Sequence, residues 1–209
     1  MDLQLAGKNA IVTGGSRGIG KAIALQLAAE GANVVIAARN KERLEATAAG
    51  LARETGVRVV PLVVDTGNKE SVDALVKQSI ETLGRIDILV NNAAVPGGIS
   101  SATSLAEVVD EQALLDIDIK VIGYLRTARA LAPHLVANGW GRIINIGGLA
   151  IRKSGRPVAT LRNVGVAAIT KNLADELGPK GINVVAVHPG ATRTERTEPA
   201  NEKALAANV

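Results

Sequence analysis

The residues with the clearest chemical purpose in this sequence form a glycine-rich turn near the N-terminus. The stretch Thr13 to Gly20 reads TGGSRGIG and lies between a short run of Val and Ile and a segment of helical period. Glycines let the backbone turn sharply and approach an anionic ligand, and the free amides at a helix start hold negative charge. The stretch therefore predicts a phosphate-binding turn, and its place directly after the first expected strand makes the prediction specific.

The same stretch nearly matches a second phosphate-binding motif. Residues 15–22 read GSRGIGKA, which differs from the nucleoside-triphosphate loop at its last position, where that loop has Ser or Thr. Ala22 stands there and has no hydroxyl with which to hold Mg²⁺. This substitution argues against a kinase or an ATPase.

The elements that must position this turn follow from the alternation of short apolar runs with longer helical segments. We expect six strands, at 9–13, 33–37, 57–64, 86–91, 142–146 and 182–188, and helices at 18–30, 41–54, 69–83, 111–137 and 158–177. Several of these strands are apolar on both faces, as buried parallel strands are. The pattern predicts one domain over 1–209 with a three-layer, doubly wound α/β Rossmann fold and a parallel sheet.

The expected helix at 111–137 carries a continuous apolar stripe. Its members recur every three or four residues: Leu114, Ile117, Val121, Leu125, Ala128, Leu131 and Leu135. We expect the stripe to pack on the sheet. Because Ile119 and Ile122 add apolar surface on other sides of the helix, we also expect a homo-oligomer.

Composition limits the partners and the compartment. Hydrophobic residues make up 47% of the chain and cysteine is absent, and no apolar run reaches the ~20 residues of a membrane span. With no signal-peptide pattern at the N-terminus, we expect a cytoplasmic protein without membrane contact. The net charge is +4, but the basic residues are scattered among 20 acids and the chain has one Trp, one Tyr and no Phe. This argues against nucleic-acid binding, and we predict no metal site.

Three motifs in this strand order resemble those of the short-chain dehydrogenase/reductase family. They are the turn at 13–20, Asn91-Asn92-Ala93-Ala94 after the fourth strand and Pro189-Gly190 after the sixth. The family forms of the first two are T-G-x-x-x-G-x-G and N-N-A-G, so Ala94 departs from the pattern. The resemblance covers essentially the whole chain, although the family's seventh strand has no counterpart before Val209.

The resemblance implies a nicotinamide dinucleotide cofactor and a small-molecule carbonyl or alcohol substrate. It assigns cofactor contacts along the motifs: the diphosphate and adenosine to Gly14, Ser16, Arg17 and Ile19, the adenine to Asp65, the adenosine ribose region to Asn91 and Ala93, and the nicotinamide carboxamide end to Pro189, Gly190 and Thr194.

The charge at the end of the second strand indicates which dinucleotide is bound. An NAD-binding fold has a carboxylate there, about 20 residues after the glycine turn, to hold the ribose hydroxyls. Here the strand ends Ala37-Ala38-Arg39-Asn40, with no acid. Arg39, supported by Arg17, can pair with a 2′-phosphate through charge-assisted hydrogen bonds. The sequence therefore favours NADP over NAD.

The catalytic positions depart furthest from the family. There, a tyrosine exchanges the proton, a lysine four residues on lowers its pKa, an upstream serine orients the substrate, and an asparagine in the preceding long helix holds a relay water. Counting back from the stretch 170–178, which resembles the family's helix end, puts Asn163 at the lysine and Ala159 at the tyrosine. The serine position falls at Gly148, or at Gly147 if the loop is one residue shorter, and Asp118 falls at the asparagine.

All four usual residues are therefore changed, so the standard mechanism is not available. We considered His188, at the end of the sixth strand, as a proton donor, because an imidazole exchanges protons near neutral pH. Tyr124 is the chain's only tyrosine, and a phenol in a core helix is more often packing. A basic cluster, Arg152, Lys153, Arg156 and Arg162, surrounds this region and favours an anionic substrate such as a carboxylate or an acyl-CoA.

Two interpretations stay open at this point. The first is an NADP-linked oxidoreductase with an atypical proton source, which we favour from the resemblance. The second is a protein that binds the dinucleotide with little or no hydride transfer and acts as a sensor or as a partner subunit. A non-redox lyase or isomerase is a third use of the same pocket.

Overall fold

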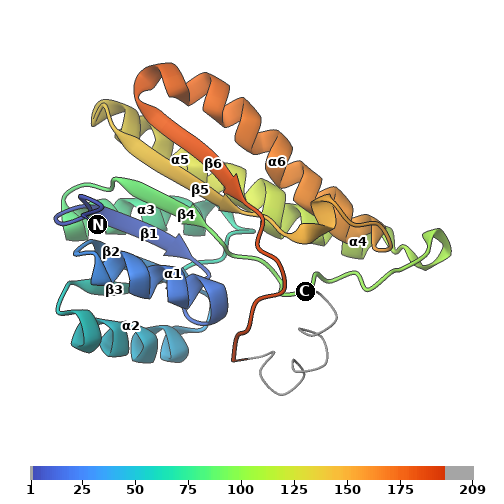
Figure 1. The fold of residues 1–209 in the computed structure, drawn as a ribbon, viewed down its shortest axis with the longest axis horizontal. Helices are drawn as coiled ribbons and strands as arrows, with labels where there is room; N and C mark the ends of the chain where they lie inside the picture. The colour runs from blue at the N-terminus through green and yellow to red at the C-terminus, as the bar shows by residue number, and fades with distance from the viewer. Residues whose placement is uncertain (1, 196–209) are drawn as a thin grey trace.

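A computed structural model describes residues 2–195 and confirms the doubly wound α/β fold (Figure 1). All strand pairs are parallel, and the sheet order is β3-β2-β1-β4-β5-β6. The strands are β1 (Asn9–Thr13), β2 (Asn33–Ala38), β3 (Val59–Val63), β4 (Ile88–Asn91), β5 (Gly141–Ile146) and β6 (Ile182–Val187). The helices are α1 (Gly18–Ala29), α2 (Lys41–Thr55), α3 (Lys69–Leu83), α4 (Asp110–Ile117), α5 (Gly123–Ala137) and α6 (Pro157–Leu177).

Helices cover the two faces of the sheet in separate groups. On one face, α3, α5 and the end of α6 bury a core around Ile11, Leu89 and Ile143. On the other face, α1 and α2 bury a second core around Val12, Ile36 and Val90. Figure 1 shows α5 and α6 beside β5 and β6, with α2 near the opposite edge of the sheet. The sheet is thus the middle of three layers, and its strand order reverses between β1 and β4, where open α/β sheets bind ligands.

The expected elements agree with this structure except at some boundaries and in one helix. Strand β4 begins two residues later than predicted. Ile86 is buried but lies outside the strand, and a buried residue gives the same apolar signal in the sequence as a strand residue. The expected continuous helix at 111–137 is wrong in its middle. Residues Asp118–Ile122 form a π-helical turn between α4 and α5.

This turn also explains why the apolar stripe is only partly buried. Leu131 and Leu135 on α5 are fully buried, whereas Leu114 on α4 is 67% exposed. An inserted residue in a helix shifts the following side chains around the axis, so a constant spacing of three and four residues no longer marks one face. The prediction that Leu114 packs on the sheet is wrong.

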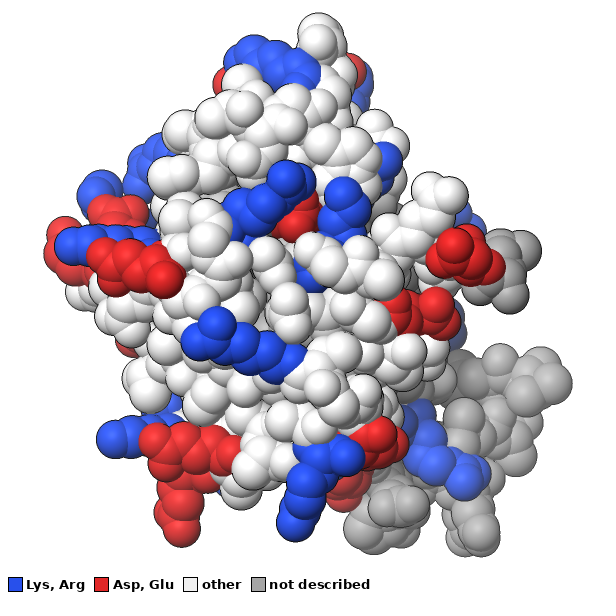
Figure 2. Space-filling view, turned by 90° about the vertical axis from the view of Figure 1, so that its left-hand side faces the viewer, with Lys and Arg blue, Asp and Glu red and all other residues white. Residues whose placement is uncertain are grey.

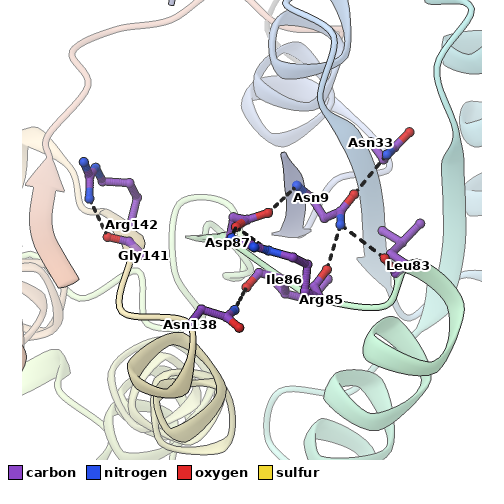
Figure 3. A network of polar contacts seen from close by, with 9 residues as sticks. All are labelled: Asn9, Asn33, Leu83, Arg85, Ile86, Asp87, Asn138, Gly141 and Arg142. Atoms are coloured by element: carbon purple, nitrogen blue, oxygen red, sulfur yellow. Dashed lines mark hydrogen bonds and ion pairs between the residues drawn. The ribbon is translucent and has the colours of Figure 1, made fainter. Parts of the chain in front are cut away.

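A polar network fixes the amino ends of the strands, at the edge of the sheet opposite the ends that build the cleft described below (Figure 3). The buried Asp87 accepts a hydrogen bond from the Asn9 backbone N–H at 2.9 Å and is ion-paired with Arg85. The Asn9 amide donates to the backbone oxygens of Leu83 and Arg85, and Asn33 donates to the Asn9 side chain. These bonds hold β1, β2 and the approach to β4 together, which keeps their other ends in register.

The outer surface on that side carries charges of both signs. Figure 2 views the face where the strands begin, and Lys and Arg side chains lie interspersed with Asp and Glu there. Among the described residues, no helix is both long enough and apolar enough to cross a membrane.

Candidate active site

A cleft of about 940 Å³ lies at the carboxyl ends of the strands. Six groups of residues line it, one at the carboxyl end of each strand: Gly14 and Ser16 to Lys21, Ala38 to Asn40 with Arg43 and Thr47, Val64 to Thr66, Asn92 to Gly97, Ile146 and Gly147, and Pro189 to Glu195 without residues 191 and 193. Ile119, Lys120 and Arg162 complete it from the helices. The volume is within the range of small-molecule and cofactor sites.

The glycine turn at the start of α1 is shaped for close approach of an anion. Gly14 and Gly18 have φ of +67° and +54°, a conformation that favours glycine. A Cβ on Gly20 would lie 2.3 Å from the Gly14 backbone oxygen, so this position cannot hold a larger residue without moving the turn. The Gly18 backbone N–H donates a 2.9 Å hydrogen bond to a carboxylate oxygen of Glu195. The Glu195 carboxylate thus accepts a hydrogen bond from a backbone N–H of the kind that binds a phosphate oxygen. The turn therefore fits a diphosphate group.

The electrostatics around Glu195 agree with an anion-binding turn. Its pKa is lowered by backbone hydrogen bonds, including the one from Gly18, and by the nearby charges of Lys21 and Arg17. The carboxylate stays ionised because donors and cations surround it. The same groups would favour a diphosphate in its place.

Cationic side chains line the part of the cleft beyond β2. Arg17, Arg39 and Arg43 all contribute to the lining, whereas Asp65 and Glu195 are its acidic members. Asp65 lies after β3 and accepts a hydrogen bond from Gly67 at 3.0 Å. Sequence reasoning missed Arg43, although Asn40 provides a signal: it caps α2 by accepting a bond from the Arg43 N–H and so fixes the first turn of the helix. Among the residues that line the cleft, no carboxylate follows β2 directly.

The segment after β4 reaches the cleft through a different residue than expected. Asn91 is fully buried, and its side chain bonds Asn145 on β5 and Thr127 on α5 rather than facing the cleft. Ala93 lines the cleft as expected, and Asn92 lines it in place of Asn91. The Asn92 side chain donates to the backbone oxygens of Thr13 and Gly14. Successive side chains of a strand point to opposite sides. Neighbouring residues such as Asn91 and Asn92 therefore face the core and the cleft, respectively.

The remaining expected cofactor residues lie on or near this cleft. Gly14, Ser16, Arg17, Ile19, Pro189, Gly190 and Thr194 all line it. The methyl group of Thr194 lies near Gly18, because a Cβ added there would be 3.6 Å from it. The structure thus places Thr194 at the diphosphate turn.

Lys120 is a second cleft-lining side chain that sequence reasoning missed. It lies in the π-helical turn, is 5% exposed and lines the cleft. Its Nζ donates to the Gly147 backbone oxygen at 3.1 Å and to Oδ1 of Asn163 at 2.9 Å. Burial, together with the smaller effect of the neighbouring positive charge of Arg162, lowers the pKa of Lys120 to about 7, and Asp116 opposes the shift. The amine can therefore change its protonation state near neutral pH.

Asp118, which we expected at this place, lies elsewhere. Its carboxylate pairs with Arg126 at 2.6 Å and does not line the cleft. The π turn directs the side chain two residues later toward the site. A signal existed in the sequence, because a lysine within an otherwise apolar stretch of a core helix needs a partner when it is buried.

The other expected catalytic positions cluster around Lys120 without supplying a hydroxyl. A Cβ on Gly148 would lie 3.2 Å from Oδ1 of Asn163, so these two positions adjoin. The Asn163 amide donates to the backbone oxygen of Ala159, whose methyl group is buried. His188 accepts a hydrogen bond on Nδ1 from the Gly148 N–H at 3.2 Å, and it packs so closely on Gly147 that a Cβ there would lie 2.1 Å from Nδ1. His188 does not line the cleft.

The lone tyrosine is a packing residue, as the helix context indicated. Tyr124 is 1% exposed, and its hydroxyl donates to the Ile146 backbone oxygen at 3.0 Å. Burial raises the pKa of this phenol. It therefore holds β5 against α5 and presents no acidic group to the cleft.

A buried ion pair braces the wall beside Lys120. Arg162 on α6 and Asp116 on α4 are 3.2 Å apart, with 8% and 2% of their side chains exposed. The other carboxylate oxygen of Asp116 accepts bonds from the backbone N–H groups of Ile99 and Ser100. One carboxylate thus joins α4, α6 and the loop after β4. Arg162 therefore belongs to this buried pair, whereas we had expected it in the basic cluster with Arg152, Lys153 and Arg156.

No group of histidine, cysteine or acidic side chains suited to a metal ion is found within the described part of the chain.

Comparison with known proteins agrees with this architecture. The family model described as short chain dehydrogenase matches residues 8–205. A dehydrogenase subunit of Thauera aromatica, named for (2S)-[(R)-hydroxy(phenyl)methyl]succinyl-CoA, is 38% identical over 93% of this chain and 77% of its own length. An uncharacterised oxidoreductase of Staphylococcus aureus (strain USA300) is 38% identical over 92% of this chain and 81% of its own.

Solved structures with the same fold include two with bound cofactor. L-sorbose reductase from Gluconobacter frateurii, complexed with NADPH and L-sorbose, superposes with a TM-score of 0.89 at 33% identity, covering 100% of this chain and 78% of that one. A xylitol dehydrogenase bound to NAD⁺ superposes with a TM-score of 0.84 at 29% identity, covering 90% and 71%. The structural relatives thus include proteins that bind NADPH and proteins that bind NAD⁺.

Proposed function

Because the chain belongs to the short-chain dehydrogenase family, a family of oxidoreductases, we propose that it is an NADP-dependent enzyme that interconverts a carbonyl and an alcohol. The observation that carries the choice of cofactor is the cationic end of the cleft. Arg17, Arg39 and Arg43 line it, and a guanidinium pairs well with a phosphate, whereas a carboxylate at this place would repel one. The structural relatives support a nicotinamide dinucleotide of either kind, since one binds NADPH and another NAD⁺, so the choice of NADP depends on these arginines.

Different residues of the chain would bind different parts of the cofactor along the cleft. When bound, the nicotinamide ring supplies or accepts the hydride. The amides at the start of α1, Gly18 among them, would hold the diphosphate, and the three arginines would hold the 2′-phosphate. Pro189 and Gly190, after β6, would position the carboxamide end beside Gly147 and Lys120.

For the substrate, the proposal favours a small anionic molecule. Arg152 and Arg156 are exposed in the segment that joins β5 to α6, and Arg156 donates to the Ser100 backbone oxygen on the loop after β4. The Thauera relative is named for a coenzyme A thioester that also carries a carboxylate. If exchange of both arginines for alanine left the affinity for acetoacetyl-CoA unchanged, this part of the proposal would be wrong.

The direct experiment titrates NADPH and NADH into the protein and follows fluorescence transfer to the bound dihydronicotinamide. We expect NADPH to bind at least about tenfold more tightly, since charge-assisted bonds to one phosphate contribute about 1.5–3 kcal/mol. NADH binding as tight as NADPH binding would contradict the cofactor assignment.

A second function is favoured by one specific observation. Gly148 and Ala159 have no hydroxyl where the family pattern has serine and tyrosine, which suits a protein that binds NADP and transfers hydride slowly or not at all. Incubating the protein with NADPH and 4-nitrobenzaldehyde, an activated carbonyl, separates the two functions. Consumption of NADPH above the protein-free rate supports the enzyme, and tight binding without consumption supports the sensor or partner subunit.

A further inference from the structure

We propose that the Nζ of Lys120 is the proton donor of this site and replaces the tyrosine that the chain lacks. The inference rests on the proposed oxidoreductase function and names the group that completes its reaction.

Lys120 lies where it can reach a bound substrate. Lys120 is the side chain of the long helical region that reaches the wall formed by Gly147, Gly148 and Asn163. An ammonium has three N–H donors, and two are directed at the Gly147 backbone oxygen and at Asn163. One donor is left for a ligand, and the residue lines the cleft where Pro189 and Gly190 also contribute. A carbonyl oxygen bound beside Gly147 would therefore meet an N–H group.

The amine and the amide of this site come from the opposite helices to those of the family pattern. In the family pattern, the long helix carries an asparagine and the helix after β5 carries a lysine. Here the long helix carries Lys120 and α6 carries Asn163, and the amine and the amide oxygen are 2.9 Å apart. The two residue types have exchanged helices, so the site keeps one cationic amine.

Charged groups on the neighbouring elements act on the protonation of the amine. Arg162 on α6 disfavours the protonated form, and Asp116 on α4 favours it. His188 lies on the other side of Gly147 and is bonded to the Gly148 N–H, while Asp118 is turned away toward Arg126. With burial dominant, the pKa of Lys120 is lowered to about 7. An acid is most useful when its pKa lies near the working pH, because both protonation states are then accessible.

In the direction of reduction, the substrate carbonyl takes up one hydride and one proton. The dihydronicotinamide of NADPH transfers a hydride to the substrate carbonyl carbon, and the C=O π electrons move to oxygen. The Lys120 ammonium gives a proton to that oxygen, which yields the alcohol, NADP⁺ and a neutral amine. Solvent returns a proton to Lys120 through the open cleft. In the direction of oxidation, the neutral amine takes the hydroxyl proton.

The test compares three variants with the wild-type chain: Lys120→Met, Lys120→Arg, and Lys171→Met as a control at an exposed position on α6. NADPH affinity is measured first by fluorescence, and the rate of 4-nitrobenzaldehyde reduction is then followed across pH. In the wild type and the control, we expect kcat to fall as pH rises through about 7. In both Lys120 variants, we expect kcat to fall by ~10²- to 10⁴-fold and this pH dependence to vanish, with the Kd for NADPH changed by less than about threefold. Arginine keeps the charge but cannot release a proton in this range.

A second measurement does not depend on turnover. In protein labelled with ¹³C at lysine Cε, the resonance that disappears in Lys120→Met should titrate near pH 7. A resonance that titrates in the ordinary lysine range would overturn the inference.

The kinetic outcomes separate this inference from the proposed function. A wild-type chain that binds no dinucleotide would refute the function itself. If NADPH binds and Lys120→Met keeps the wild-type rate and pH profile, or if the wild type has no rate above background, Lys120 is not the donor. A rise in the Kd for NADPH with an unchanged pH profile would assign Lys120 to ribose binding instead and would also refute the inference.

Discussion

At the scale of single residues, one arginine should decide the cofactor preference. Arg39 lines the cleft immediately after β2, at the place where a carboxylate would bind ribose hydroxyls. For Arg39→Glu, we expect the Kd for NADPH to rise by about 10- to 100-fold and the affinity for NADH to increase, because the new charge repels a phosphate and accepts hydroxyl hydrogen bonds. Fluorescence titration of both dinucleotides measures this. Arg53→Glu, at an exposed position on α2, is the matched control and should change neither constant; equal losses in the two variants would show a general charge effect.

Lys120 should also leave a signature in stability. Its pKa is lowered from 10.5 to about 7, so between these values the unfolded chain binds a proton that the folded chain does not. The free energy of unfolding contributed by this group therefore rises with pH over that range, and the burial cost is fully present below about pH 7. We expect Lys120→Met to gain more stability relative to wild type at about pH 6 than at about pH 9, at up to about 1.4 kcal/mol per unit of pKa shift.

Urea unfolding at the two pH values measures this difference, with Lys171→Met as a control whose effect should not depend on pH. A Lys120→Met effect that is the same at both pH values would show that the amine has an ordinary pKa in the folded protein.

The residues that sequence reasoning placed correctly and incorrectly differ in a physical way. The glycine turn could be predicted because its constraint is local: Gly14 and Gly18 need positive φ, and the segment around them adjoins a strand. Asn91 and Asn92 could not be told apart by motif, because which one faces the ligand depends on the pleat of β4. Asp118 and Lys120 could not be told apart by counting, because the π turn between them changes the helical period.

At the scale of elements, the Asp116–Arg162 pair should stabilise the site more than any exposed ion pair. It joins α4 to α6 and holds the loop after β4 through the N–H groups of Ile99 and Ser100. For Asp116→Asn, we expect a loss of about 3 kcal/mol or more in the free energy of unfolding, because the buried Arg162 charge is left without its partner. The loop at Val95 to Gly97 should also loosen and weaken NADPH binding, since these residues line the cleft.

Chemical denaturation with Asp73→Asn as the control checks this prediction. Asp73 pairs with Lys69 on the surface of α3, with about half of each side chain exposed, and its loss should change stability by about 0–1 kcal/mol. Similar losses in the two variants would mean that the buried pair contributes no more than a surface pair.

The elements themselves were largely predictable. All six strands were expected from apolar runs, because parallel strands buried on both faces have a distinctive composition. The irregular π turn was not, since no residue within Asp118–Ile122 is a glycine or a proline. It forms in the folded context, where Lys120 and Val121 are buried against α6 and β5.

At the scale of the whole molecule, a face formed by α4 and α6 remains apolar. Leu114 and Leu115 on α4 are 67% and 48% exposed, and Leu161 and Val164 on α6 are 54% and 43% exposed. Helices α4 and α6 lie in contact with each other. Exposed apolar side chains on two neighbouring helices are typical of an interaction site. Together with the homo-oligomer expected from the sequence, they lead us to expect that two copies of the chain associate through this face.

The double variant Leu114→Lys with Leu161→Lys should therefore dissociate the oligomer, as measured by sedimentation velocity. The control is Val63→Lys on β3, which is also half exposed but lies at the other edge of the sheet, and it should sediment as the wild type. A wild-type chain that sediments as a monomer at all concentrations would contradict the expectation.

We propose that this chain keeps an NADP-binding cleft in which the cationic amine comes from a different helix. A crystal structure grown with NADP⁺ tests it most directly. The account predicts the diphosphate on the amides at the start of α1, the 2′-phosphate among Arg17, Arg39 and Arg43, and the nicotinamide C4 facing the Nζ of Lys120 across a space large enough for a carbonyl. A cleft that remains empty at saturating NADP⁺, or a nicotinamide ring bound away from Lys120, would contradict it.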